Sequence, residues 1–88
     1  MALIAPRVIA RVKSSSASEI AMMSWEWVLR TDGQVLYRLT EVDGRGERNP
    51  WSLVTQLPAA DLPGLRGDRA KAMAVLDGFA RQHGHKIG

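Results

Sequence analysis

The stretch WEWVLRTDGQVLYRL, residues 25–39, constrains the fold more than any other part of the chain. Apolar and polar side chains alternate on both sides of Thr31-Asp32-Gly33, a pattern typical of two antiparallel strands joined by a tight turn. A two-residue Asp-Gly turn would mix polar and apolar groups on both faces of the hairpin. A three-residue turn, with Gly33 in the left-handed conformation of a bulge, makes one face wholly apolar and is the predicted register.

This register assigns every side chain of the hairpin to one of two faces. The predicted core face consists of Trp25, Trp27, Leu29, Val35, Tyr37 and Leu39. On the other face, Glu26 is opposite Arg38 and Val28 is opposite Leu36, so that a cross-strand ion pair lies beside an aliphatic pair. We therefore expect this open face to make contact with a partner.

A third strand is predicted after the hairpin. Residues 43–50 hold two Gly, two Arg and an Asn-Pro pair, a composition typical of a longer hairpin loop. Residues 51–57 then alternate, which places Trp51, Leu53 and Leu57 toward the core and Val54 and Gln56 on the open face.

The last predicted element is a helix over residues 68–83, with Asp68 as N-cap and Gly84 as the left-handed stop. Its apolar stripe should cover the Trp face of the sheet and consists of Met73, Leu76, Phe79 and Ala80. A row of small residues lies beside the stripe and favours close approach of the helix to the sheet, with a helix contact in a dimer as the alternative: Ala70, Ala74 and Gly78.

The predicted fold is a single α+β domain, in which a three-stranded antiparallel sheet of two hairpins is covered on one face by a C-terminal helix. The chain has 88 residues, enough for one small core, and this β-β-β-α domain is assigned to residues 19–88. Cysteine is absent, which excludes disulfides and thiolate chemistry. The longest uncharged run is far shorter than the roughly 20 residues that cross a membrane. We expect a cytoplasmic location.

The first 18 residues hold three basic side chains and no acid, namely Arg7, Arg11 and Lys13. With its serine-rich end, this segment is predicted to be a mobile basic arm. The apolar alternation over residues 8–13 leaves an edge strand with a basic outer side as the alternative. Residues 19–88 hold nine basic and nine acidic side chains, and a neutral folded part counts against nucleic-acid binding by the fold alone.

The motifs of common catalytic sites are missing from the sequence. It has no Cys nucleophile, no glycine-flanked Ser, no phosphate-binding Gly loop and no helical His pair with Glu. A His-x-His pair, His83 and His85, could hold a metal with two further ligands, but its place at the chain end predicts a solvated tail. We therefore expect neither an enzyme nor a cofactor or metal site.

The order strand, strand, strand, helix, with WVLRTDGQVLYRL as its first hairpin, is similar to the arm-binding domains of tyrosine recombinases and to YegP-type small bacterial domains. The first resemblance implies a sheet that lies in a DNA major groove. The spacing WEW…DGQVLY…W resembles a WW domain, which implies that Tyr37 and Trp51 dock a proline-rich ligand. Each resemblance covers residues 24–83 at most.

Two functional hypotheses follow from the open face. In the first, an aliphatic spot with a charged rim contacts another protein or a second copy of the chain; its residues are Val28, Leu36 and Val54 with Glu26, Arg30 and Arg38. In the second, basic side chains contact nucleic acid, and these are Arg30, Arg38, Arg45, Arg48, Arg7, Arg11 and Lys13. We prefer the first, because the register leaves no Trp on the open face for bases to stack on.

Overall fold

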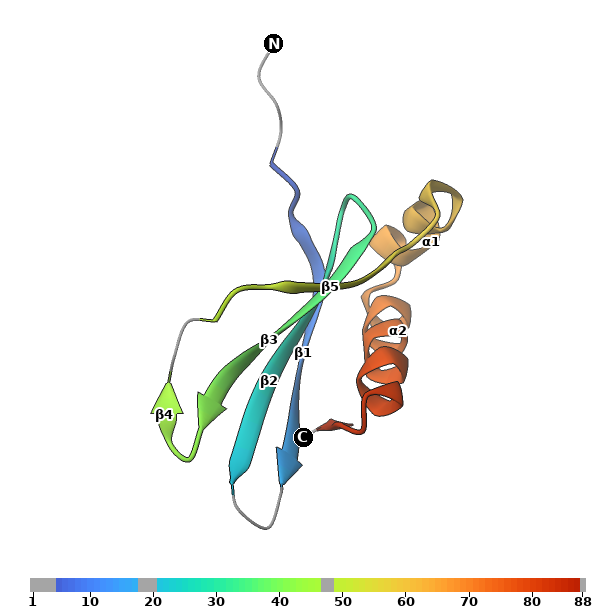
Figure 1. Cartoon of the computed structure of the whole chain (residues 1–88). Helices are drawn as coiled ribbons and strands as arrows, with labels where there is room; N and C mark the ends of the chain where they lie inside the picture. Colours follow the sequence, from blue (N-terminus) through green and yellow to red (C-terminus); the bar gives the residue numbers. More distant parts are fainter. Residues whose placement is uncertain (1–4, 18–20, 47–48, 88) are drawn as a thin grey trace.

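The computed structural model describes residues 5–17, 21–46 and 49–87. Within these residues the fold is α+β, with helices against one face of a six-stranded antiparallel sheet (Figure 1). The strands are β1 (Val8–Ala17), β2 (Met22–Arg30), β3 (Gln34–Val42), β4 (Arg45–Gly46), β5 (Ser52–Gln56) and β6 (Lys86–Ile87). The helical elements are η1 (Ala59–Asp61), α1 (Leu62–Gly67) and α2 (Arg69–Gln82).

The strand order is β4-β3-β2-β1-β6, and β5 also pairs with β3. The predicted α+β class, antiparallel sheet and C-terminal helix are confirmed, but the prediction of three strands is wrong. The additional strands are β1, formed by the supposed arm, and two strands of two residues each, β4 and β6.

The β2–β3 hairpin has the predicted three-residue turn. Its paired residues match the prediction: Trp25 with Leu39, Glu26 with Arg38, Trp27 with Tyr37, Val28 with Leu36 and Leu29 with Val35. Gly33 has a φ of 87°, and its N–H donates to the Arg30 carbonyl over 2.9 Å. These pairs confirm the predicted register. A longer or shorter turn would have moved apolar side chains away from the core.

Residues 8–17 form β1, so the prediction of a flexible arm is wrong there and the edge-strand alternative is confirmed. β1 pairs with β2 along its length, and it is an edge only in its N-terminal half, because β6 pairs with Ser14 and Ser15. Ala10 and Val12 are buried in the core, which stabilises the segment as a strand. Residues 1–4 and 18 of the predicted arm lie outside the described residues.

The third predicted strand is present as β5, but the faces of residues 51–54 are reversed, whereas Gln56 and Leu57 keep their predicted faces. Leu36 pairs with Leu53 while Val35 pairs with Thr55, so Val54 is the extra residue of a bulge. A bulge shifts the alternation by one residue. Val54 consequently packs against the core, whereas Leu53 is exposed, contrary to the prediction for both.

The bounds of α2 agree with the predicted helix. The Asp68 side chain accepts a hydrogen bond from the Lys71 N–H over 3.1 Å, and Gly84 has a φ of 80°. The buried stripe of α2 is Ala72, Leu76 and Ala80, so it shares only Leu76 and Ala80 with the predicted stripe.

Met73 is exposed rather than buried, and Phe79 is only partly buried. The small-residue row Ala70, Ala74 and Gly78 is also exposed, and a Cβ on Gly78 would meet no atom within 4 Å. The interpretation of that row as a close helix-to-sheet contact is therefore wrong. The face of α2 that meets the sheet carries Ala72, Leu76 and Ala80 instead, and Leu65 of α1 packs in the same core.

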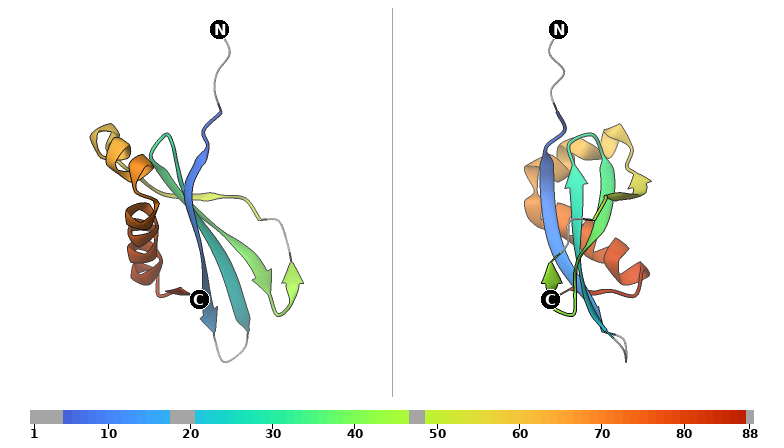
Figure 2. Two further views of the ribbon diagram at one scale, coloured as in Figure 1. Left: turned by 180° about the vertical axis from the view of Figure 1, so that it is seen from behind. Right: turned by 60° about the vertical axis from the view of Figure 1, so that its left-hand side comes forward.

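The core lies between α2 and the sheet, with the helices on one side of the sheet in both views of Figure 2. The buried centre of the hairpin is Trp27, Leu29 and Val35. The outer part of the predicted core face is only half-buried; this part is Trp25, Tyr37 and Leu39. No helix of the described residues is long and apolar enough to cross a membrane.

Candidate functional site

The candidate site is the open face of the sheet, which points away from α2. Residues paired directly across antiparallel strands have side chains on the same face, so the register identifies its members. Basic side chains converge there from four strands: Arg11 and Lys13 of β1, Arg30 of β2, Arg38 of β3 and Lys86 of β6. We call these five side chains the basic face.

One carboxylate, that of Glu26, lies in the middle of the basic face. Its oxygens are 3.4 Å from Arg11 Nε and 3.8 Å from Arg38 Nη2, and its side chain is 10% exposed. Lys13 is its direct cross-strand partner on β1. The predicted Glu26–Arg38 pair is confirmed, and because three cations share this one acid, the centre of the face is positive.

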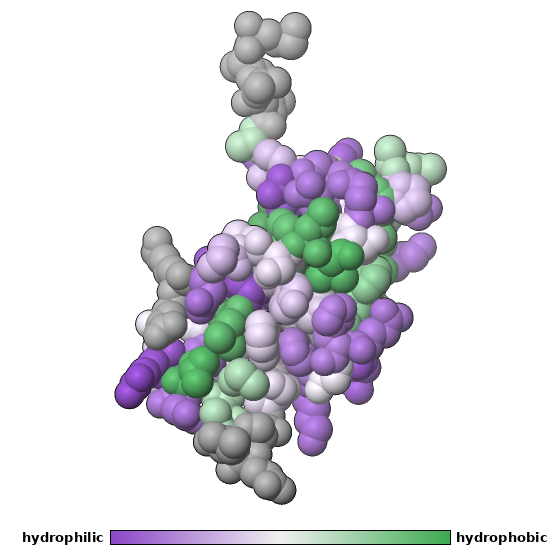
Figure 3. Space-filling model, viewed as in Figure 1, coloured by the Kyte–Doolittle hydropathy of each residue, from purple (hydrophilic) through white to green (hydrophobic). Residues whose placement is uncertain are grey.

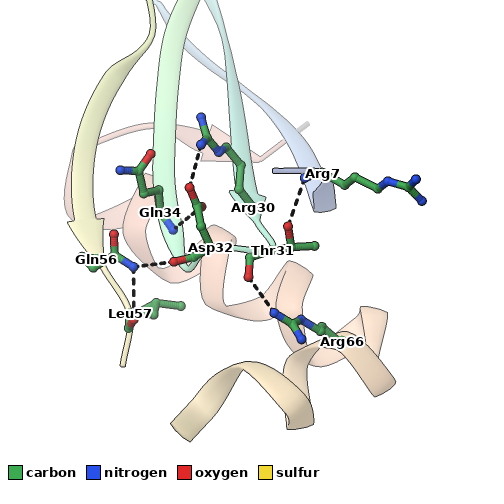
Figure 4. Close-up of polar contacts among 8 residues, drawn as sticks. All are labelled: Arg7, Arg30, Thr31, Asp32, Gln34, Gln56, Leu57 and Arg66. Carbon is green, nitrogen blue, oxygen red and sulfur yellow. Dashed lines mark hydrogen bonds and ion pairs between the residues drawn. The ribbon is translucent and has the colours of Figure 1, made fainter. Parts of the chain in front are cut away.

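The second acid near the face, Asp32, holds Arg30 at the hairpin turn (Figure 4). Arg30 Nη2 donates to Asp32 Oδ2 over 2.6 Å, and the Gln34 N–H donates to Asp32 Oδ1 over 3.1 Å. Burial alone would raise the pKa of Asp32, but these hydrogen bonds and the Arg30 charge outweigh it and lower that pKa. Arg30 is therefore held by Asp32 at the end of the face.

The same turn is tied to three other parts of the chain. The Arg7 N–H donates to Thr31 Oγ1 over 3.0 Å, and Arg66 donates to the Thr31 carbonyl over 2.8 Å. The Leu57 N–H donates to the Gly33 carbonyl over 2.9 Å. In Figure 4 the Arg7 side chain points away from these contacts, so Arg7 is held here by its backbone.

The remaining arginines of the nucleic-acid hypothesis lie elsewhere. Arg45 is exposed on β4, at the far edge from β1, where it pairs with Val42. Arg48 lies outside the described residues.

The aliphatic spot of the protein-contact hypothesis is not an exposed surface. Val28 is 1% exposed and Leu36 is 7% exposed. Their direct neighbours across the sheet, Arg11 and Leu53, flank them on the open face. Val54, the third member of the spot, packs on the core side. On the side of the molecule seen in Figure 3, apolar surface appears as separate green patches within a hydrophilic surface.

Trp51 lies at the open face, although the sequence places it in the core. It is 38% exposed, and the guanidinium carbon of Arg38 lies 4.3 Å from its ring centroid. Sequence reasoning missed Trp51 because the bulge in β5 leaves no mark on the apolar alternation. It also missed Lys86, because a two-residue strand is too short to show a period.

The two histidines pack on the opposite face, at the end of α2, so the prediction of a solvated tail is wrong for His85. Its ring stacks on Trp25 with centroids 4.8 Å apart, and its Nδ1 is 3.2 Å from Ser14 Oγ. Burial, with a smaller contribution from the charge of His83, lowers the pKa of His85. In the described part of the chain, no three His, Asp or Glu side chains are grouped so as to hold a metal ion.

Comparison of the chain with protein-family models, curated proteins and solved structures finds no match. The ligand pair implied by the WW resemblance is not present, because Tyr37 stacks on Trp27 on the core side while Trp51 lies on the open face. The function must therefore be argued from the basic face itself.

Proposed function

We propose that this chain is a non-enzymatic binding module and that its basic face binds nucleic acid. The observation that carries the proposal is that one face of the sheet presents five basic side chains from four strands, next to an exposed Trp51. Three of them, Arg11, Lys13 and Arg38, surround Glu26. Phosphate contacts by Lys and Arg supply most of the affinity of such a surface. We also expect the protein to act in the cytoplasm.

Two earlier arguments against nucleic acid lose their basis. The folded part was counted as neutral because only residues 19–88 were assigned to it. β1 in fact contributes Arg11 and Lys13 to the sheet. The folded sheet therefore carries the positive charge assigned to a separate arm. The lack of an aromatic residue on the open face was the second argument, and Trp51 removes it.

Binding to another protein is the second candidate. It is favoured by Leu53, which is 57% exposed and lies on the open face opposite Leu36. A partner that covers Leu53 would also have to neutralise the surrounding cations, so a second copy of this chain would bring like charges together. An acidic protein surface fits this candidate better than self-association.

The test compares two variants that lose the same charge from different faces. Lys13→Gln with Lys86→Gln removes two exposed cations from the basic face, whereas Arg69→Gln with Lys71→Gln removes two exposed cations from α2. Fluorescence anisotropy of the full-length variants with a labelled oligonucleotide of about 16 nucleotides, over a series of salt concentrations, measures affinity and salt dependence.

We expect the basic-face variant to lose affinity about tenfold, and its log-log salt slope to fall by about 0.7 for each lost contact on a single strand. The α2 variant should keep an affinity near that of the parent. Equal losses in both variants, or no binding by the parent chain at about 150 mM salt, would contradict the proposal. Binding of an acidic protein without oligonucleotide binding would support the second candidate.

A further inference from the structure

We propose that the nucleic acid is single-stranded and that one of its bases stacks on Trp51, with its phosphates on the β1 side of the basic face. This inference rests on the proposed function, because it names the form of nucleic acid that the same face would bind. Three features of the described residues carry it: the exposure of Trp51, the way in which its ring is held, and the position of the cations relative to it.

Trp51 is exposed at a place where burial would be expected. Indole rings are among the most apolar and usually the most covered side chains, and the other two Trp residues of this chain lie on the core face. Trp51 keeps 38% of its surface exposed, beside Leu53, which is 57% exposed. Trp51, which directly precedes β5, and Leu53 of β5 thus leave apolar surface exposed on the open face.

The Trp51 ring is held in position without a ligand. Arg38 covers the ring with its guanidinium carbon 4.3 Å from the centroid, and Glu26 is 3.8 Å from the same guanidinium. Two residues before Trp51, Asn49 Nδ2 donates to the Leu39 carbonyl over 2.7 Å. Pro50 further restricts the backbone between them. A planar ligand that stacks on the exposed part of the ring therefore costs little conformational entropy.

The cations lie across the strands from Trp51. Arg38, Glu26 and Lys13 are directly opposite one another on β3, β2 and β1. Neighbouring strands are about 4.8 Å apart, so Lys13 lies roughly 10 Å from Arg38 along this row. Lys86 of β6 continues the basic side chains beyond β1. A nucleotide chain that crosses the strands can place a base on Trp51 and neighbouring phosphates on Lys13 and Lys86.

This arrangement favours a single strand over a duplex. In a duplex the bases are stacked on each other, and their faces are not accessible to an indole ring. The bases of a single strand are free to stack on aromatic side chains in a way that tolerates any sequence. Phosphate contacts alone would not distinguish the two forms.

The experiment uses the full chain with a labelled single strand and with a duplex of the same sequence. Trp51→Ala removes the ring, and Trp51→Phe keeps an aromatic ring without the indole fluorescence. We expect Trp51→Ala to lower the affinity for the single strand about tenfold, to leave duplex affinity within about twofold, and to leave the salt slope unchanged because no charge is lost. Trp51→Phe should keep most of the single-strand affinity.

Tryptophan fluorescence supplies a second measurement that does not depend on the stability of the Ala variant. The single strand should quench the parent emission, and Trp51→Phe should bind without this quenching, because Trp25 and Trp27 lie on the core side. Unchanged quenching in Trp51→Phe, or equal losses of single-strand and duplex affinity in Trp51→Ala, would overturn the inference.

The two proposals fail in different ways. If Trp51→Ala keeps full single-strand affinity while Lys13→Gln with Lys86→Gln loses it, the stacking inference is overturned and the proposed function stands. If the parent chain binds neither oligonucleotide, the proposed function fails and the inference falls with it.

Discussion

Gly33 is the residue on which the central hairpin depends most directly. Its φ of 87° lies in the left-handed region, which residues with a Cβ adopt at a cost. A Cβ at this position would also lie 2.8 Å from both Gln56 Nε2 and the Leu57 carbonyl oxygen. The turn residue therefore links the conformation of the hairpin to the packing of the segment that follows β5.

Replacing Gly33 by Ala should destabilise the fold by about 2–4 kcal/mol, because left-handed strain and a steric contact with backbone act together. Gly44→Ala is the matched control, since Gly44 has a φ of 82° but no atom within 4 Å of a built Cβ. Its cost should be about 1–2 kcal/mol from the backbone strain alone. Urea denaturation measures both values, and equal costs would show that the contact with Leu57 relaxes freely.

At the scale of elements, the two-residue strand β6 directly follows a histidine that packs on the sheet. His85 stacks on Trp25 and shares a hydrogen bond with Ser14, whose hydroxyl also accepts from Trp27 Nε1 over 2.9 Å. β6 in turn pairs with the end of β1. The C-terminal residues thus connect α2 to the sheet edge through an aromatic contact with the neutral imidazole.

Acidification should weaken this connection. Burial lowers the pKa of His85 below its ordinary value of 6.5, so the folded state binds a proton less readily than the unfolded state. The contribution of His85 to the free energy of unfolding is complete above its ordinary pKa of 6.5, and it is lost as the pH falls through the lower pKa of the folded state. We expect the free energy of unfolding to be smaller at about pH 5 than at about pH 7.5.

His85→Phe is the control for the pH experiment, because it keeps a ring beside Trp25 and removes the titrating group. Urea denaturation of this variant at the same two pH values should show a smaller loss of stability on acidification than the parent. An equal loss in parent and variant would assign the pH dependence to other groups.

At the scale of the whole molecule, β1 connects the core, the basic face and the C-terminal edge. Its Ala10 and Val12 lie in the core, while Arg11 and Lys13 lie on the basic face. It pairs with both β2 and β6, and α2 packs mainly on β1. Residues 8–17 are therefore an integral part of the folded domain.

Deletion of residues 1–17 should abolish cooperative thermal unfolding, because it removes a whole strand ladder from a small domain of marginal stability. Circular dichroism during heating measures the transition. Lys13→Gln in the full chain is the control, since it removes a charge from β1 and leaves the strand in place; its melting temperature should remain close to that of the parent. A deletion variant with an unchanged melting temperature would contradict the role of β1.

The sequence by itself determined the β2–β3 hairpin and α2, because both depend on contacts between residues close in the chain. The Gly33 turn left only one register with an apolar face, and Asp68 and Gly84 marked the ends of the helix. The Glu26–Arg38 pair of the site followed from that register.

Only the tertiary structure decided which segments complete the sheet and where the side chains of β5 point. β1 is a strand because its apolar residues pack in the core and its backbone pairs with β2, and both partners are distant in sequence. Trp51 reaches the open face because one bulge residue, Val54, reverses the alternation. Side chains of a strand alternate between its two faces, so one extra residue exchanges the faces. Pairing with a distant strand decides where that extra residue lies, and the local sequence pattern does not show it.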